Sequence, residues 1–253
     1  RANGLFWLSL FFIFLVLIVS GRKGLYALVG LVFSFAVIYR FIVPQILAGR
    51  NAVWVAILGA FLMLVVTLYT SHGMNKKSIA AFFGIAGTLL FVGLMAQWTV
   101  GVLHFTGYGA EEASFLKQEV GDNLNLIGLV VAGIIIAAIG ILDDVAVTQA
   151  STVFSLATTS PLLRRWDLFR KAMEVGKDHI SAVINTLVLA YTGAALPLTL
   201  LFSLHSAPIQ YITSLEFVTE EIVRTVISSA GLVLAVPLTT LVAVLFASRP
   251  EER

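Results

Sequence analysis

Long runs of apolar residues, separated by short polar segments, dominate the chain. The runs occupy residues 5–20, 24–43, 52–70, 78–104, 124–155, 179–205 and 220–247. A helix needs about 20 apolar residues to cross the hydrocarbon core of a bilayer. Because a backbone in lipid must satisfy its own hydrogen bonds, continuous runs of this kind predict helices rather than strands. The pattern therefore predicts an all-α, polytopic membrane bundle of seven helices.

The composition agrees with a membrane protein and excludes several other classes. Of the 253 residues, 59% are hydrophobic and 12% are charged, whereas about 25% are charged in a typical soluble domain. The chain has no cysteine, so thiol chemistry and thiolate metal sites are excluded. A formal net charge of +2 gives no reason to expect a nucleic-acid partner. Without a phosphate-binding loop, dinucleotide fingerprint or metal-ligand cluster, we expect neither an enzyme nor a cofactor or metal.

Basic residues indicate which ends of the helices face the cytoplasm. Most of the 16 Lys and Arg residues follow the first, third and fifth runs or lie in the C-terminal tail, while acidic residues gather in the other loops. The positive-inside rule then places the N-terminus outside and the C-terminus in the cytoplasm. The basic residues on the predicted cytoplasmic side are Arg22, Lys23, Lys76, Lys77, Arg164, Arg165, Arg170, Lys171, Lys177, Arg249 and Arg253.

The predicted helices divide into two parts. Residues 1–48 hold two N-terminal helices, and residues 49–253 hold a five-helix core with an acidic outer loop at 106–123. The chain starts at Arg1 rather than at a Met, with no signal peptide. We therefore expect it to be the membrane part of a longer protein, with an upstream span and an extracytoplasmic domain.

The basic segment 160–178 has its own pattern. Leu162, Trp166, Phe169 and Met173 recur there at helical spacing beside Arg and Lys residues. This spacing predicts a helix lying in the cytoplasmic interface of the membrane. An ordinary basic loop that obeys the positive-inside rule explains the charges equally well.

Two adjacent carboxylates follow a long apolar run. If the helix ended at Leu142, Asp143 and Asp144 would lie in cytoplasmic water, although acids at a helix C-terminus oppose the macrodipole. No Gly or Pro occurs between Asp143 and Ser160 to stop the helix. We therefore expect one helix over 124–155, with both carboxylates inside the membrane, where ionisable groups mark ion or substrate pathways.

A stripe of small and then polar residues runs along one face of this predicted helix. Its members are Gly133, Ala137, Gly140, Asp144, Thr148, Ser151 and Ser155, at steps of three and four. The stripe predicts that Asp144 faces other helices, while Asp143 lies about 100° around the helix from it. An enclosed carboxyl group there could take up and release a proton, and a structural hydrogen bond to Asn or Thr is the alternative.

The next predicted helix offers partners for these carboxylates. Asn185 and Thr186 lie about two turns inside its cytoplasmic end, and Asp178 shares the face of Asn185. An Asn that links helices structurally is the alternative to a functional one. The predicted proton-relay residues are Asp144, Asp143, Thr148 and Asn185, supported by Gln149, Ser151, Thr186 and Asp178.

Three segments carry a resemblance to a known family. They are GILDDVAVTQASTV at 140–153, AMEVGKDHI at 172–180 and NTLVLAYTGAALP at 185–197. In these segments and over nearly its whole length, the chain resembles the YibE/F family of bacterial multi-pass membrane proteins. The resemblance implies a location in the bacterial cytoplasmic membrane and an additional N-terminal span. It implies no mechanism, because the family's biochemical role is not established.

A more remote resemblance concerns residues 52–247. The Gly140-x-x-x-Asp144 motif, the basic loop and the Asn185-Thr-Leu segment resemble the membrane half of resistance-nodulation-division transporters and related protein-export subunits. This implies that Asp144 carries protons and, more weakly, that Asn185 takes part by tuning it. The chain has no second homologous half, so a homo-oligomer or a paralogous partner subunit would supply it.

Two functions follow as hypotheses. The first is a proton-coupled permease or export component with an intramembrane aspartate. The second is a non-transporting scaffold or assembly subunit of a larger complex. An intramembrane aspartate protease is a third, weaker reading, because adjacent Asp143 and Asp144 point to different helix faces and cannot share one water.

Overall fold

The protein is a bundle of long helices. The computed structural model describes residues 2–121, 124–204 and 208–247, and over these residues it contains helices and no strand, as predicted. The elements are α1 (Ala2–Val37), the π-helix η1 (Ile38–Ile42), α2 (Val43–Leu47), α3 (Ala52–His72), α4 (Lys76–Val102), α5 (Glu111–Val120), α6 (Leu126–Thr159), α7 (Arg165–Ala194), α8 (Leu196–Leu204), α9 (Ile209–Ser214) and α10 (Glu216–Phe246).

Several of these helices have the length and composition of membrane spans. Within the described residues there are five such stretches: Asn3–Leu47, which runs through α1, η1 and α2, and the helices α3, α4, α6 and α10. A bilayer core takes about 20 residues of helix, and each stretch reaches that length. The chain is therefore a multi-pass helical membrane protein.

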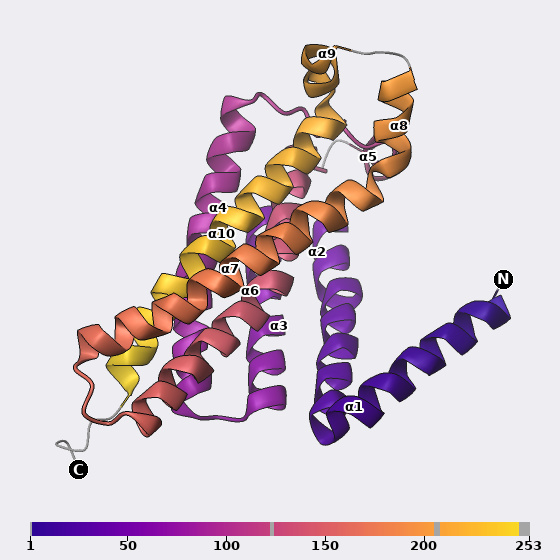
Figure 1. Ribbon diagram of the computed structural model, residues 1–253. Helices are drawn as coiled ribbons and strands as arrows, with labels where there is room; N and C mark the ends of the chain where they lie inside the picture. The colour runs from indigo at the N-terminus through magenta and orange to yellow at the C-terminus, as the bar shows by residue number, and fades with distance from the viewer. Residues whose placement is uncertain (1, 122–123, 205–207, 248–253) are drawn as a thin grey trace.

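The first stretch reverses direction at Gly21. This residue has φ 53° and ψ −131°, which are not helical values, and a positive φ is strained for any residue with a side chain. Figure 1 shows the result as two arms that meet at an acute angle, the first of which points away from the bundle. The reversal falls in the gap between the first two predicted helices, at residues 21–23.

The sixth predicted helix, 179–205, falls on two elements. Helix α7 runs unbroken from Arg165 to Ala194, and α8 begins at Leu196. The break lies next to Pro197, which has no backbone N–H to continue the hydrogen-bond ladder. The basic segment predicted as an interfacial helix therefore continues directly into the first half of this predicted span.

The core is formed by α4, α6 and α10, which pack closely against one another. Small residues allow the close approach: a Cβ added to Gly84 of α4 would lie 2.1 Å from Oγ1 of Thr239 on α10. Helix α3 packs on α6, α1 packs mainly on α3, and α7 lies across α10 and α6. Helix α3 thus lies between the two arms of α1 and the core.

The connection between α4 and α5 is fastened to the start of α10. One carboxylate, that of Glu216, accepts hydrogen bonds from the backbone N–H of Thr106 (2.7 Å), the hydroxyl of Thr106 (2.7 Å) and the backbone N–H of Gly107 (2.6 Å). Helix α5 follows, within the segment 106–123 predicted as an acidic outer loop. These contacts join the segment after α4 to the first residue of α10, at the upper edge of Figure 1.

Candidate functional site

Helix α6 carries both aspartates near its middle. The side chain of Asn125 caps its first turn by accepting a hydrogen bond from the N–H of Gly128 (2.9 Å), and the helix continues to Thr159. The prediction of one unbroken helix past Asp143 and Asp144 is confirmed. No Gly or Pro lies between Asp143 and Ser160, which explains why the helix continues past the two acidic residues.

The prediction of which aspartate is enclosed is wrong. Asp144 is exposed in the structure, together with Gly140 and Thr148 of the same stripe, whereas Asp143 is partly buried. The Asp143 carboxylate has one oxygen, Oδ1, that is shielded from solvent and has no hydrogen-bond partner. The face of α6 that packs on α3, α4 and α10 is instead the apolar one, with Ile135 and Leu142 fully buried.

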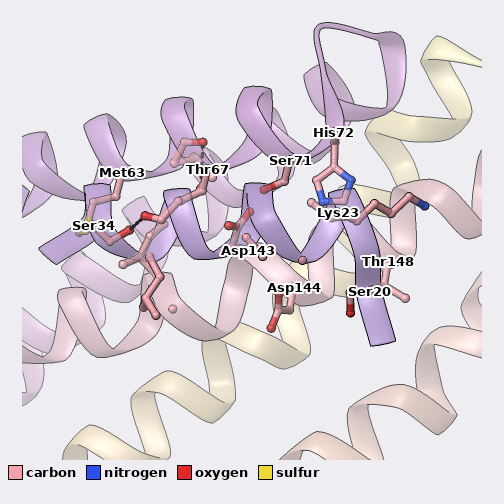
Figure 2. A pocket seen from close by; sticks show the side chains of 18 of the residues that line it. Ser20, Lys23, Ser34, Met63, Thr67, Ser71, His72, Asp143, Asp144 and Thr148 are labelled. Atoms are coloured by element: carbon pink, nitrogen blue, oxygen red, sulfur yellow. Dashed lines mark hydrogen bonds between the residues drawn. The ribbon is translucent and has the colours of Figure 1, made fainter. Parts of the chain in front are cut away.

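Both aspartates nevertheless line one cleft. The cleft has a volume of about 630 Å³ and lies between the two arms of α1, α3 and α6. Figure 2 shows Asp143 at its centre, with Ser34 and Met63 toward one end and His72 and Lys23 toward the other. The polar side chains that line it are Ser20, Lys23, Ser34, Thr67, Ser71, His72, Asp143, Asp144 and Thr148.

The neighbours of the aspartates come from α1 and α3. The Thr67 side chain of α3 lies beside the Asp143 carboxylate, and its hydroxyl donates to the backbone carbonyl of Leu64 (3.3 Å). His72 lies close enough to Asp144 and Lys23 for their charges to act on it. Thr67 precedes His72, the last residue of α3, by about one and a half turns, or roughly 8 Å. The carboxylates therefore line the cleft a short distance from one end of α3.

A smaller cleft of about 250 Å³ adjoins the first one toward that end. The two clefts share Lys23, Ser71, His72 and Val147. Ser151, one of the predicted supporting residues, lines the smaller cleft together with Lys77. The cleft therefore continues along α6 from the aspartates toward the α3–α4 connection.

Three other predicted residues lie elsewhere. Asn185, Thr186 and Asp178 are exposed on α7 and do not line either cleft. Helix α7 packs through a different face, on which Ile180, Val183, Ile184 and Leu187 contact the buried Val145, Leu232 and Val236. The predicted contact between Asn185 and Asp144 or Thr148 is therefore not formed in this structure.

Gln149 has a well-defined structural environment. Its side chain is 3% exposed, and its amide nitrogen donates to the carbonyl of Ala172 (2.9 Å) and the hydroxyl of Thr240 (2.7 Å). It thereby links α6 to α7 and α10, away from the aspartates. Among the described residues no group of three or more His, Asp or Glu side chains could hold a metal ion.

Lys23, Thr67, Ser71 and His72 were missed by the sequence reasoning. Each lies at a helix end or within an apolar helix, where an isolated polar residue carries no distinctive spacing. Only the packing of α1 on α3 and of α3 on α6 brings them to the aspartates.

Comparison with known proteins confirms the family resemblance. A family model described as YibE/F-like protein matches residues 8–249, which is nearly the whole chain. The chain belongs to the YibE/F-like family. No curated protein and no solved structure matches it. The more remote resemblance of residues 52–247 to resistance-nodulation-division transporters is not supported by these comparisons.

Proposed function

We propose that this YibE/F-like protein is a proton-coupled permease or export component whose proton carriers are Asp143 and Asp144. The observation that carries the proposal is the enclosed Oδ1 atom of Asp143, which has no donor although the carboxylate lines an open cleft. A buried ionised carboxylate is costly unless donors satisfy its oxygens. A proton is the smallest group that removes this charge, and ionisable groups within membrane helices are typical of proton pathways.

The surrounding side chains give each residue a role in this proposal. Asp143 holds the proton beside Thr67, which contacts the same carboxylate. Asp144, exposed to the cleft, exchanges protons with water that enters past His72 and Lys23. Thr148 and Ser151 continue the polar lining toward the end of the clefts. Gln149 holds the helices together around this path.

Infrared difference spectroscopy tests the proton carriers directly. Purified protein in lipid is titrated around neutral pH, where ordinary hydrated carboxylates stay ionised, and the carbonyl band of protonated carboxyl groups is followed. We expect a titrating band that shrinks in Asp143→Asn and in Asp144→Asn and remains in Glu174→Gln, since Glu174 is an exposed carboxylate on α7 outside the clefts. A band of undiminished size in the double Asp143→Asn, Asp144→Asn variant would overturn the proposal.

The proposed topology has seven spans in the bacterial cytoplasmic membrane, with the N-terminus outside and the C-terminus in the cytoplasm. Two arms of α1 and the pair α7–α8 supply the additional crossings beyond α3, α4, α6 and α10. Support comes from the basic residues beside the reversal in α1, the α3–α4 connection and the α6–α7 connection, which lie at the same, lower end of Figure 1. The clefts then open toward the cytoplasm.

A non-transporting scaffold is the second candidate, and one observation favours it. Residues 3–20 form an apolar arm whose side chains are almost all exposed, apart from the partly buried Val16. Such an arm could assemble with a second copy or with a paralogous subunit. A scaffold tolerates Asp143→Asn and Asp144→Asn with assembly unchanged and predicts no titrating band from these residues, so the same spectra discriminate between the candidates.

A further inference from the structure

The two clefts beside the aspartates together form one channel-like space along α6. They meet at Lys23, Ser71, His72 and Val147, which line both. We call this space the joined cleft. One end of it is lined by Met63 and Ser34, and the other by Asn75 and Lys77.

Full charges of opposite sign are separated along the joined cleft. The carboxylates of Asp143 and Asp144 line its inner part, whereas Lys77 lines only its outer part and Lys23 lies where the two parts meet. His72 lies beside Lys23. Two carboxylates and two ammonium groups therefore balance, but they are arranged as a negative inner region and a positive outer region.

The spacing of these regions follows from α6. From Asp144 to Ser151, which lines the outer part, is about two helical turns, or roughly 10 Å. From Thr67, beside Asp143, to His72 is roughly 8 Å along α3. A ligand that engages both regions thus carries its charges several ångströms apart.

Much of the remaining wall of the inner part is apolar. Ala27, Leu31, Met63, Ile136 and Ile139 line the inner part around the aspartates. The volumes of about 630 Å³ and 250 Å³ are far larger than a proton or a bare metal ion needs, and the larger one falls within the usual range for small-molecule sites. The space therefore suits an organic molecule with an apolar body.

We propose that the joined cleft binds a small amphipathic zwitterion, with its ammonium group at Asp143 and Asp144 and its anionic group at Lys23 and Lys77. This inference deepens the proposed function and rests on it, because it names the substrate class of the proposed permease. An ammonium group donates charge-assisted hydrogen bonds to carboxylates. It replaces the proton as the partner of the aspartates, so the zwitterion and the proton compete for the same negative region.

Three matched probes test the charge requirement. Isothermal titration calorimetry on the full chain in lipid nanodiscs compares dileucine with N-acetyl-dileucine, which has no ammonium group, and with dileucine amide, which has no carboxylate. We expect dileucine to bind. We expect each capped probe to bind at least about tenfold more weakly, which is the effect of losing one charge-assisted hydrogen bond.

Two variants assign each end of the probe to its side chains. We expect Asp144→Asn to weaken dileucine binding about tenfold without further weakening N-acetyl-dileucine. We expect Lys77→Met to weaken dileucine in the same way without further weakening dileucine amide. Glu174→Gln, outside the clefts, leaves all three affinities unchanged, and size-exclusion profiles confirm that each variant is folded.

The outcomes separate this inference from the proposed function. Equal affinity for the three probes, or no binding of dileucine, overturns the zwitterion site. If the infrared carboxyl band still titrates in that case, the aspartates remain proton carriers and only the substrate class is removed. If dileucine binds as expected but no band titrates, the binding site stands and proton coupling falls.

Discussion

One glycine sets the separation of two core helices. A methyl group on Gly84 of α4 would lie 2.1 Å from Oγ1 and 2.8 Å from the backbone Cα of Thr239 on α10. Because the backbone cannot move aside without separating the helices, we expect Gly84→Ala to lower stability by about 1–3 kcal/mol. Thermal unfolding in nanodiscs measures this as a lower Tm.

A second glycine on the same helix provides the control. The nearest atom to a Cβ on Gly87 is Cδ1 of Leu238, at 3.7 Å, an ordinary contact. Alanine has the better helix propensity by about 1 kcal/mol, so Gly87→Ala leaves Tm unchanged or raises it. Equal Tm values for the two variants would mean that α4 and α10 are farther apart than the structure has them.

A substitution of Gln149 tests whether this residue links helices structurally or takes part in the proton path. It donates to Ala172 and Thr240 and has no place in the cleft with the aspartates. We expect Gln149→Met to lower stability by about 1 kcal/mol, the usual worth of an interhelical hydrogen bond in a membrane protein. The infrared carboxyl band should be unchanged, and loss of the band with a normal Tm would place Gln149 in the proton path instead.

At the level of single residues, the sequence indicated that the aspartates matter but not how they are oriented. The spacing around Asp144 gave the helix face correctly. It did not reveal that this face is exposed, because lipid is as apolar as a protein core and hydrophobicity cannot distinguish the buried side of a membrane helix. Asp143, on the neighbouring face, is the one with an enclosed oxygen.

At the level of elements, helix α6 was predictable and the cleft was not. The apolar run, the Asn125 cap and the absence of a stop signal before Ser160 determine α6 locally. The cleft depends on how α1 packs on α3 and α3 on α6, which no local pattern encodes. Lys23 and His72 reach the aspartates only through that packing.

At the same scale, the α4–α5 connection is fastened to the start of α10. Glu216 holds the N–H groups of Thr106 and Gly107 with a charged carboxylate, and such bonds contribute about 1.5–3 kcal/mol each. We expect Glu216→Gln to speed amide hydrogen exchange at these two residues at least about tenfold.

The control for Glu216→Gln is Glu221, a carboxylate about one and a half helical turns farther along α10. Glu221 pairs with Arg224 at 2.9 Å and is not a hydrogen-bond partner of Thr106 or Gly107. Glu221→Gln therefore leaves exchange at the two amides unchanged. Unchanged exchange in Glu216→Gln as well would show that the loop is held by its apolar contacts, such as those of Phe105, rather than by the carboxylate.

At the level of the whole molecule, the arms of α1 decide how often the chain crosses the membrane. As one straight helix, the 45-residue stretch Asn3–Leu47 would be about 68 Å long, more than twice the roughly 30 Å hydrocarbon core. The reversal at Gly21 turns it into two arms of spanning length. In the proposed topology, the two arms return the chain to the side from which it started.

Single cysteines test this arrangement, because the chain has none of its own. Arg22 follows the reversal at Gly21 and Lys76 begins α4 at the same end of the bundle, whereas Glu112 lies in α5 at the other end. We expect an impermeant maleimide to label cysteines at positions 22 and 76 from the cytoplasmic side only, and at position 112 from the outside only. If the stretch instead crossed once as a tilted helix, position 22 would lie in the hydrocarbon core and would be labelled from neither side, while positions 76 and 112 would still be labelled from opposite sides.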